Sequence, residues 1–141
     1  LVGSEMCIRD RPNYSAFKNL KFLTMIKDNI GDEQIKSTLI SVGLDPESKK
    51  VVGKFSLGMR QRLGIAQAIM ENPHILILDE PMNGLDKRGV EDIRKILMDL
   101  KKKGKLILLA SHNPLDIDIL CDCVYELDAG TIVNQRSILP R

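Results

Sequence analysis

The sequence predicts an α/β fold with a mostly parallel sheet, and two apolar runs separated by a helical pattern carry this prediction. Residues 75–78 and residues 106–110 each consist of consecutive apolar side chains. A strand of a parallel sheet is covered on both faces, so it reads as a continuous apolar run rather than an alternating one. Residues 87–103 lie between the runs, and their apolar side chains recur at helical spacing. We therefore expect two buried strands with a helix between them.

Three helices are expected ahead of the first strand. Residues 15–29 and 32–42 each show an apolar face, and Gly43 ends the second of these helices. A polar loop at residues 45–54 then leads into residues 57–70, the strongest helical pattern in the chain. The side chains expected to face inward are Phe17, Leu20, Leu23, Ile26, Ile35, Leu39, Val42, Leu63, Ala66, Ile69 and Met70.

The elements expected after the second apolar run are short. Asn113 and Pro114 suit the N-cap and the first position of a helix that runs to residue 121, because asparagine caps the first turn and proline fits a helix start. Residues 124–127 and 131–133 are expected to be strands, joined by a turn at residues 128–130.

Composition limits the possible functions. The chain has 141 residues, enough for at most one domain, and 43% of them are hydrophobic, enough for a core. A formal net charge of +2 gives no reason to expect nucleic acid or an anionic membrane surface as a partner. No apolar run approaches the length of a membrane span. Cys121 and Cys123 lack a second pair or a nearby histidine set, so they suit free thiols in a reducing cytosol rather than a metal site.

The most informative stretch of the chain is residues 55–81. Asp79 and Glu80 directly follow the first apolar run, and in open α/β sheets the chemistry lies at the carboxyl ends of the strands. Two adjacent carboxylates there suit one metal-directed acid and one general base. Upstream, Ser56 and Gly58 open the strongest helix, whose unpaired N–H groups and dipole favour an anion.

These motifs, in this order and spacing, resemble those of the ATP-binding-cassette (ABC) ATPases. The signature element is Phe55-Ser56-Leu57-Gly58-Met59, a variant of L-S-G-G-Q, and residues 75–79 with Glu80 behind them form the Walker B strand. Asn83-Gly84-Leu85-Asp86 is similar to the D-loop, and His112 to the switch histidine. The resemblance covers about residues 12–135 and is greatest to exporters of the bacitracin and lantibiotic self-protection type. It implies the C-terminal part of a P-loop NTPase core, plus the helical subdomain of the family.

The resemblance implies a site for ATP and Mg²⁺ in which three residues serve the nucleotide of their own subunit. Asp79 is expected to hold Mg²⁺ through a water, and Glu80 is expected to be the general base that polarises the attacking water. His112 is expected to contact the terminal phosphate. The alternatives are a carboxylate at Glu80 that only supports neighbouring groups or lies on the surface, and a structural histidine at position 112.

The signature element is expected to work across a dimer interface. Ser56, Leu57, Gly58 and Met59 would contact the ATP held by the opposite subunit. Leu57 stands where the family has its first glycine and restricts the backbone, and Met59 replaces a glutamine near the ribose. Asp86 is expected in the dimer interface, although it would also be satisfied as the N-cap of the following helix, and both roles stay open.

The domain organisation inferred from the resemblance is an incomplete cassette. No G-x-x-x-x-G-K-[ST] element occurs in these 141 residues, and the family places it upstream, so we expect the chain to begin after it. Residues 1–11 resemble a translated sequencing adaptor and are set aside. Residues 12–54 are expected to belong to the helical subdomain, and residues 55–141 to the signature helix and the C-terminal half of the core. Such a fragment by itself is expected to be inactive.

The leading hypothesis is an ATP-binding and ATP-hydrolysing subunit of an ABC exporter. It would work as a homo- or heterodimer of ABC domains with separate transmembrane permease subunits, on the cytoplasmic side of the cell membrane and without nucleic acid. One alternative is a non-transport ABC protein acting on the ribosome or DNA, which the near-neutral charge disfavours. The other alternative is a non-catalytic fragment.

Overall fold

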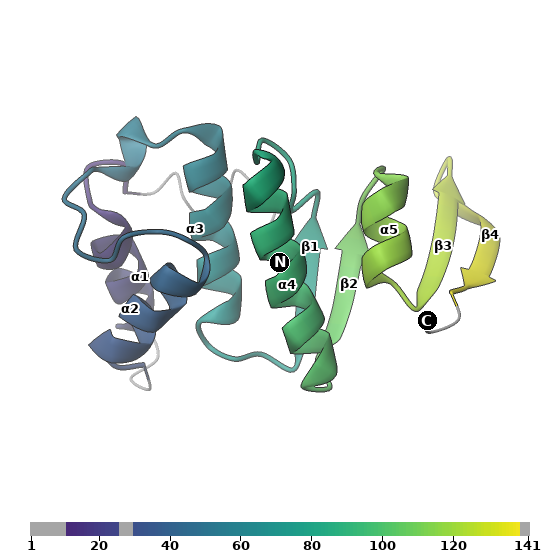
Figure 1. Ribbon diagram of the computed structural model, residues 1–141, viewed down its shortest axis with the longest axis horizontal. Coiled ribbons are helices and arrows are strands. Elements are labelled where there is room, and N and C mark those ends of the chain that lie inside the picture. The colour runs from purple at the N-terminus through teal and green to yellow at the C-terminus, as the bar shows by residue number, and fades with distance from the viewer. Residues whose placement is uncertain (1–10, 26–29, 139–141) are drawn as a thin grey trace.

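The computed structural model describes residues 11–25 and 30–138, and within them it confirms an α/β fold with a parallel strand pair (Figure 1). The helices, with one 3₁₀ turn, and the strands follow each other in an order close to the expected one. They are α1 Ala16–Thr24, α2 Asp32–Ser41, η1 Val52–Lys54, α3 Leu57–Ile69, β1 Ile75–Asp79, α4 Lys87–Lys102, β2 Leu106–Ala110, α5 Pro114–Leu120, β3 Cys123–Asp128 and β4 Thr131–Ser137.

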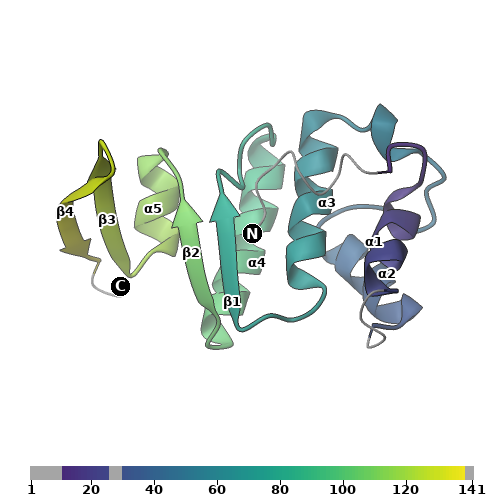
Figure 2. The ribbon, with the colours of Figure 1, turned by 180° about the vertical axis from the view of Figure 1, so that it is seen from behind.

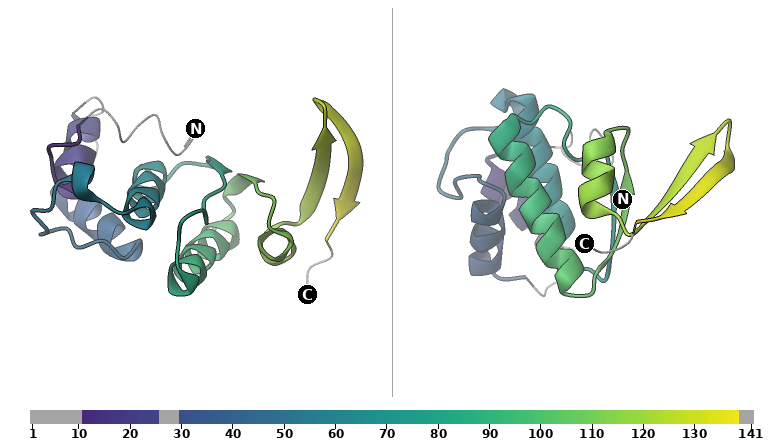
Figure 3. Two further views of the ribbon diagram at one scale, coloured as in Figure 1. Left: turned by 90° about the horizontal axis from the view of Figure 1, so that it is seen from above. Right: turned by 45° about the vertical axis from the view of Figure 1, so that its right-hand side comes forward.

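The strands β1 and β2 are parallel, with Asp79 opposite Ala110 at their carboxyl ends. Helix α4 connects them and lies against one face of the pair, so that both strands are in front of it when the molecule is seen from behind (Figure 2). Seen from above, α4 and α5 lie on the same side of the strands (Figure 3). Within the described residues, the other face of the pair is left uncovered.

The expectation of two fully buried strands is wrong for the described residues. In β1 the side chains alternate, with Leu76 and Leu78 buried and Ile75 and Ile77 exposed. No side chain of β2 is fully buried. Since a continuous apolar run suits cover on both faces and α4 supplies cover on one, every second apolar side chain is left exposed.

The buried core joins the helices to the first strand. Helices α1 and α2 pack on each other and α2 packs on α3. Their buried side chains form one cluster with those of β1, α4 and α5, among them Leu20, Leu39, Leu63, Leu78 and Leu97. The cluster is continuous across residues 54 and 55, and the expected division into subdomains at that point stays a prediction.

Several helices begin or end where the sequence predicts, because a capping side chain or a glycine fixes the backbone there. Ser15 accepts a hydrogen bond from the Lys18 N–H and caps α1, and Gly43 has a φ of 76° where α2 stops. Helix α1 ends at Thr24, ahead of the predicted residue 29, and residues 26–29 lie outside the described ranges.

The antiparallel hairpin β3–β4 is longer than expected. Ala129 and Gly130 form its tight turn, with φ angles of 46° and 81°. Two central residues with positive φ match the twist of a hairpin, and the turn lies inside the expected range 128–130. Among the described helices, none is both long and apolar enough to cross a membrane.

An ion pair fixes α5 on α4. The Asp116 carboxylate is 2% exposed, and its Oδ1 accepts hydrogen bonds from Arg94 Nε at 2.7 Å and Nη2 at 2.5 Å. Breaking such a buried pair by removing one partner costs about 3–5 kcal/mol, because the remaining charge is left unpaired. Asn113 caps α5 through its Oδ1, which accepts from the Leu115 N–H at 3.0 Å. The short segment between β2 and α5, which contains His112, is therefore anchored on its C-terminal side.

Candidate functional site

The carboxyl ends of β1 and β2 bring three predicted site residues to one edge of the strand pair. Asp79 is the last residue of β1, Glu80 follows it, and His112 lies two residues beyond the end of β2. The Glu80 N–H donates to the Ala110 carbonyl at 2.9 Å and so extends the pairing of the two strands by one step. The parallel register thus accounts for the proximity of residues 32 positions apart in the sequence.

Glu80 and His112 are in direct contact. Glu80 Oε1 accepts from the His112 backbone N–H at 3.0 Å and lies 2.6 Å from the ring Nδ1. The His112 side chain is 89% exposed and that of Glu80 is 34% exposed. When Nδ1 carries the proton it donates to Glu80, and Nε2 is then the ring nitrogen left for another group. One carboxylate oxygen thus orients the histidine, and the second remains for other chemistry.

The backbone at Glu80 is unusual for a residue other than glycine. Its φ is 45°, in the left-handed region that costs of order 1–3 kcal/mol for such residues. The Glu80 carbonyl accepts from the Asn83 N–H at 3.0 Å and from Gln61 Nε2 at 3.2 Å. Gln61 closes the S-x-G-x-x-Q pattern that begins at Ser56, but no role is predicted from the sequence for Gln61 itself. Its contact depends on the packing of α3 beside β1, for which a local pattern gives no signal.

Asp79 is exposed at the end of β1. In the described part of the chain its carboxylate takes part in no hydrogen bond or ion pair. No group of three or more histidine, cysteine, aspartate or glutamate side chains arranged for a metal occurs among the described residues. A lone exposed carboxylate fits Mg²⁺, which keeps several waters and takes few protein ligands. It does not fit a metal that requires an all-protein cage.

The signature element forms the start of α3. Ser56 is the N-cap, and its Oγ accepts from the Met59 N–H at 3.2 Å. Ser56 and Leu57, the N-cap and the first residue of this helix, are exposed to solvent. Gly58 lies against the D-loop, and a Cβ at this position would be 3.0 Å from the Gly84 carbonyl oxygen.

Leu57, which departs from the family pattern, packs onto Gly84. A Cβ on Gly84 would lie only 2.5 Å from Leu57 Cγ, and the φ of Gly84 is 73°. Leu57 therefore occupies the space that a side chain at position 84 would need. Asp86 caps α4 by accepting from the Gly89 N–H at 2.8 Å, so its role as an N-cap is confirmed. Its expected role in a dimer interface stays a prediction.

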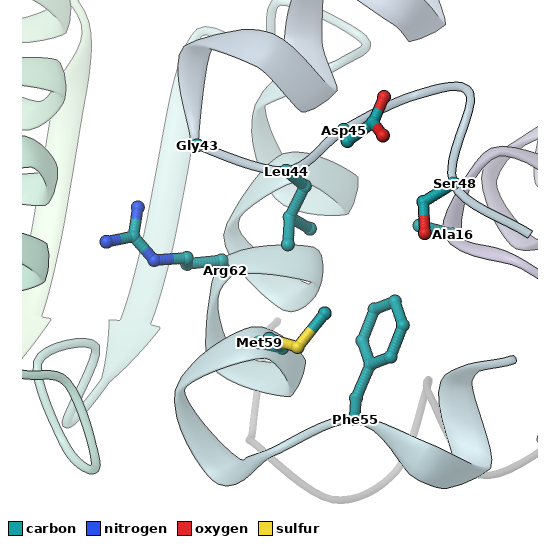
Figure 4. A pocket seen from close by; sticks show the side chains of 8 residues that line it. All are labelled: Ala16, Gly43, Leu44, Asp45, Ser48, Phe55, Met59 and Arg62. Atoms are coloured by element: carbon teal, nitrogen blue, oxygen red, sulfur yellow. The ribbon is translucent and has the colours of Figure 1, made fainter. Parts of the chain in front are cut away.

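Met59 faces the helical part of the chain. With Phe55 and Leu44 it lines a cavity of about 320 Å³, and Figure 4 shows Met59 and Phe55 converging on that cavity. Lys50 Nζ lies 3.6 Å from the Met59 sulfur. Met59 thus has a packing role in this chain, in addition to the nucleotide contact expected for it.

Replacing Gly84 with Ala is expected to destabilise the complete cassette by about 1–3 kcal/mol, because it adds a clash with Leu57 to the strain of a positive φ. Gly104→Ala is the matched control, since Gly104 has a φ of 75° and nothing within 4 Å of its would-be Cβ. Denaturant unfolding should show a larger loss for Gly84→Ala, and the added change Leu57→Ala should recover the difference. Equal losses for the two glycine variants would contradict a Leu57–Gly84 contact.

Comparison with known proteins decides the family. The family model described as "ABC transporter" matches residues 7–83, which include the signature element, the Walker B strand and the first residue of the D-loop. The chain belongs to the ABC transporter family. The match starts inside the segment that resembles an adaptor, and residues 1–10 lie outside the described structure, so that interpretation stays untested.

Curated relatives of this ABC chain include transport ATP-binding proteins. The uncharacterized ABC transporter ATP-binding protein YybJ of Bacillus subtilis is 44% identical over 91% of the chain and 59% of its own length. The bacitracin transport ATP-binding protein BcrA of Enterococcus faecalis is 39% identical, over 89% of the chain and 41% of its own length. The lantibiotic transport ATP-binding protein SrtF of Streptococcus pyogenes is 38% identical, over 88% of the chain and 54% of its own length. The chain thus spans about half the length of these relatives.

Solved ABC structures confirm the fold. The dimeric post-hydrolysis structure of the ATP-binding cassette MJ0796 with ADP and Pi has a TM-score of 0.83 at 19% identity, covering 96% of this chain and 62% of that one. CbiO1 from Clostridium perfringens, part of the cbiONQ transporter complex, has a TM-score of 0.71 at 26% identity, covering 91% of this chain and 53% of that one.

Proposed function

We propose that this chain is part of the ATP-hydrolysing subunit of an ABC exporter, and that Asp79, Glu80 and His112 act on the ATP of their own subunit. The contact between Glu80 and His112 at the carboxyl ends of β1 and β2 is the observation that supports this proposal most directly. Relatives that serve bacitracin and lantibiotic transport support the exporter class.

In the proposed mechanism Glu80 is the general base. One of its carboxylate oxygens is held by the His112 N–H and ring, which fixes the direction of the other oxygen. That second oxygen would accept the proton of the attacking water. The exposed His112 ring would present Nε2 to the terminal phosphate. Asp79 would hold Mg²⁺ through a water, and the bound ion would supply charge neutralisation at the phosphates.

The start of α3 is proposed to bind the ATP of a second subunit. Ser56 and the N–H groups of Leu57 and Gly58 lie at the N-terminus of a 13-residue helix, where the dipole favours a phosphate. The proposed assembly is a head-to-tail pair of ABC domains that associates with separate permease subunits at the cytoplasmic side of the membrane. In it, residues 12–54 would belong to the helical subdomain and residues 55–141 to the signature helix and core.

The experiment that tests this function is phosphate release by the complete cassette encoded by the native gene. We expect release to require Mg²⁺, to stop with EDTA and to return when Mg²⁺ is restored. Asp79→Asn should raise the Mg²⁺ concentration for half-maximal rate by roughly 10–100-fold, because it weakens the hold on a metal-bound water. Asp99→Asn, an exposed carboxylate on α4, should leave it unchanged. Absence of ATP-dependent release, or an unchanged Mg²⁺ requirement in Asp79→Asn, would refute the proposal.

A further inference from the structure

Helix α3 contacts the peptide that follows the proposed catalytic base through one buried polar side chain. Gln61 is 8% exposed, and its Nε2 donates to the Glu80 carbonyl at 3.2 Å. We infer that Gln61 is a positioning residue for ATP hydrolysis, which holds the Glu80 backbone in its left-handed conformation and so fixes the direction of its carboxylate. This inference rests on the proposed function, because it assumes that Glu80 is the base.

The Glu80 peptide needs such a contact for a structural reason. The next residue is Pro81, which is buried and has no N–H group. The peptide between them can therefore be held by hydrogen bonds only through the Glu80 carbonyl oxygen. That oxygen has two lone pairs, and Asn83 N–H and Gln61 Nε2 supply one donor each. Without Gln61, the Glu80 carbonyl keeps only the hydrogen bond from the Asn83 N–H, which belongs to the same loop and does not tie that loop to a helix.

Helix α3 is a rigid base for this donor. Leu63, Ile65 and Ala66 of the same helix are buried in the core. Next to Gln61, Arg62 donates to the Val42 carbonyl at 2.5 Å and lies 3.6 Å from Asp92 of α4. Because α3 is fixed against α2 and α4, the loop after β1 adapts to the position of Gln61, and not the reverse. A site supported by a helix is held more precisely than one supported by its own loop.

Loss of the Gln61 hydrogen bond is expected to change the position of the Glu80 carboxylate through the backbone of Glu80 itself. The φ of 45° at Glu80 costs free energy, and the surrounding contacts must maintain it. If the peptide relaxes, the Cα–Cβ direction rotates and Glu80 Oε1 moves away from the His112 N–H. The nucleotide itself is not expected to touch Gln61, so the loss should appear in kcat and not in ATP affinity.

The test uses the complete cassette with two variants that separate hydrogen-bond donation from shape. Gln61→Met keeps the length of the side chain without a donor, and Gln61→Lys restores a donor on a different shape. We expect kcat to fall about tenfold in Gln61→Met, with the ATP dissociation constant unchanged, and to recover substantially in Gln61→Lys. Gln67→Met, at a half-buried position on the same helix, is the matched control and should retain wild-type turnover.

A second measurement reports the carboxylate without any turnover. The His112 backbone N–H is bonded to Glu80 Oε1, so its proton chemical shift depends on the position of Glu80. In Gln61→Met this shift should move toward the value found in Glu80→Ala, while thermal unfolding shows that the cassette is still folded. In Gln67→Met the shift should stay at the wild-type value.

The possible outcomes distinguish this inference from the proposed function. Wild-type kcat in Gln61→Met, or an equal loss in the Met and Lys variants, would overturn the positioning role, since the second result indicates a requirement for shape alone. If Gln61→Met does not fold, the test rests on Gln61→Lys. Substantial turnover in Gln61→Lys would then support the positioning role, and a folded Gln61→Lys without turnover would overturn it. Glu80→Gln is measured in the same assay. If that variant is inactive while Gln61→Met is not, only the inference fails, whereas an active Glu80→Gln refutes the proposed function itself.

Discussion

Glu80→Gln in the complete cassette is expected to lower ATP turnover by about 10²–10⁴-fold while ATP binding is preserved, because the change removes the proposed proton acceptor and little else. The glutamine carbonyl can still accept from the His112 N–H, which now donates to Glu80 Oε1. Asp79 is untouched, so the Mg²⁺ site should remain. The ATP-bound dimer should therefore accumulate, and phosphate release together with size-exclusion chromatography would detect both effects.

The matched control for this experiment is Glu91→Gln, which neutralises an exposed carboxylate on α4. It should hydrolyse ATP at the wild-type rate, so that a general effect of charge is separated from loss of the base. If Glu80→Gln keeps most of its turnover, Glu80 is not the base, and its contact with His112 has a structural purpose only.

Local features of the fold followed from the sequence because their causes are local. The caps at Ser56, Asp86 and Asn113 are set by side chains that bond to the next turn of their own helix. Asp79, Glu80 and His112 are expected at one ATP site because of the family resemblance, and the parallel register of β1 and β2 is what brings them to one edge. The chemical roles of those residues rest on family resemblance and stay proposals.

Features that depend on distant contacts could not be read from the sequence. The exposure of Leu106 and Leu108 depends on which elements cover the second face of the strand pair. The apolar run predicts only that both faces of the strand are suited to burial. The contact of Leu57 with Gly84 joins residues 27 positions apart by number, and the bond from Gln61 to Glu80 joins residues 19 positions apart. In each case the type of neither residue predicts which residue it contacts.

A second large effect is expected when lesions are distributed between the two subunits of the proposed head-to-tail dimer. Ser56 would serve the ATP held by the partner, and Glu80 the ATP of its own subunit. With Ser56→Arg in one subunit and Glu80→Gln in the other, both lesions fall on the same ATP site and the second site stays intact. With both changes in one subunit, each ATP site carries one lesion, and turnover should be almost lost.

Comparing these two arrangements also controls for differences in stability between the dimers. Ser56→Arg removes the N-cap of α3, and loss of such a cap costs about 1 kcal/mol. Both arrangements contain the same two substitutions, one copy of each per dimer, so this cost is the same in both. Two differently tagged copies of the cassette, purified through both tags, would give each arrangement free of the parent dimers.

The phosphate-release rates of these two arrangements, compared at matched dimer concentration, test the central claim most directly. That claim is that the strand-end residues act on the ATP of their own subunit and the start of α3 acts on that of the partner. It predicts clear turnover when the substitutions are divided between subunits and almost none when they are combined in one. Equal rates would contradict the head-to-tail assignment and leave Ser56 as an ordinary helix cap.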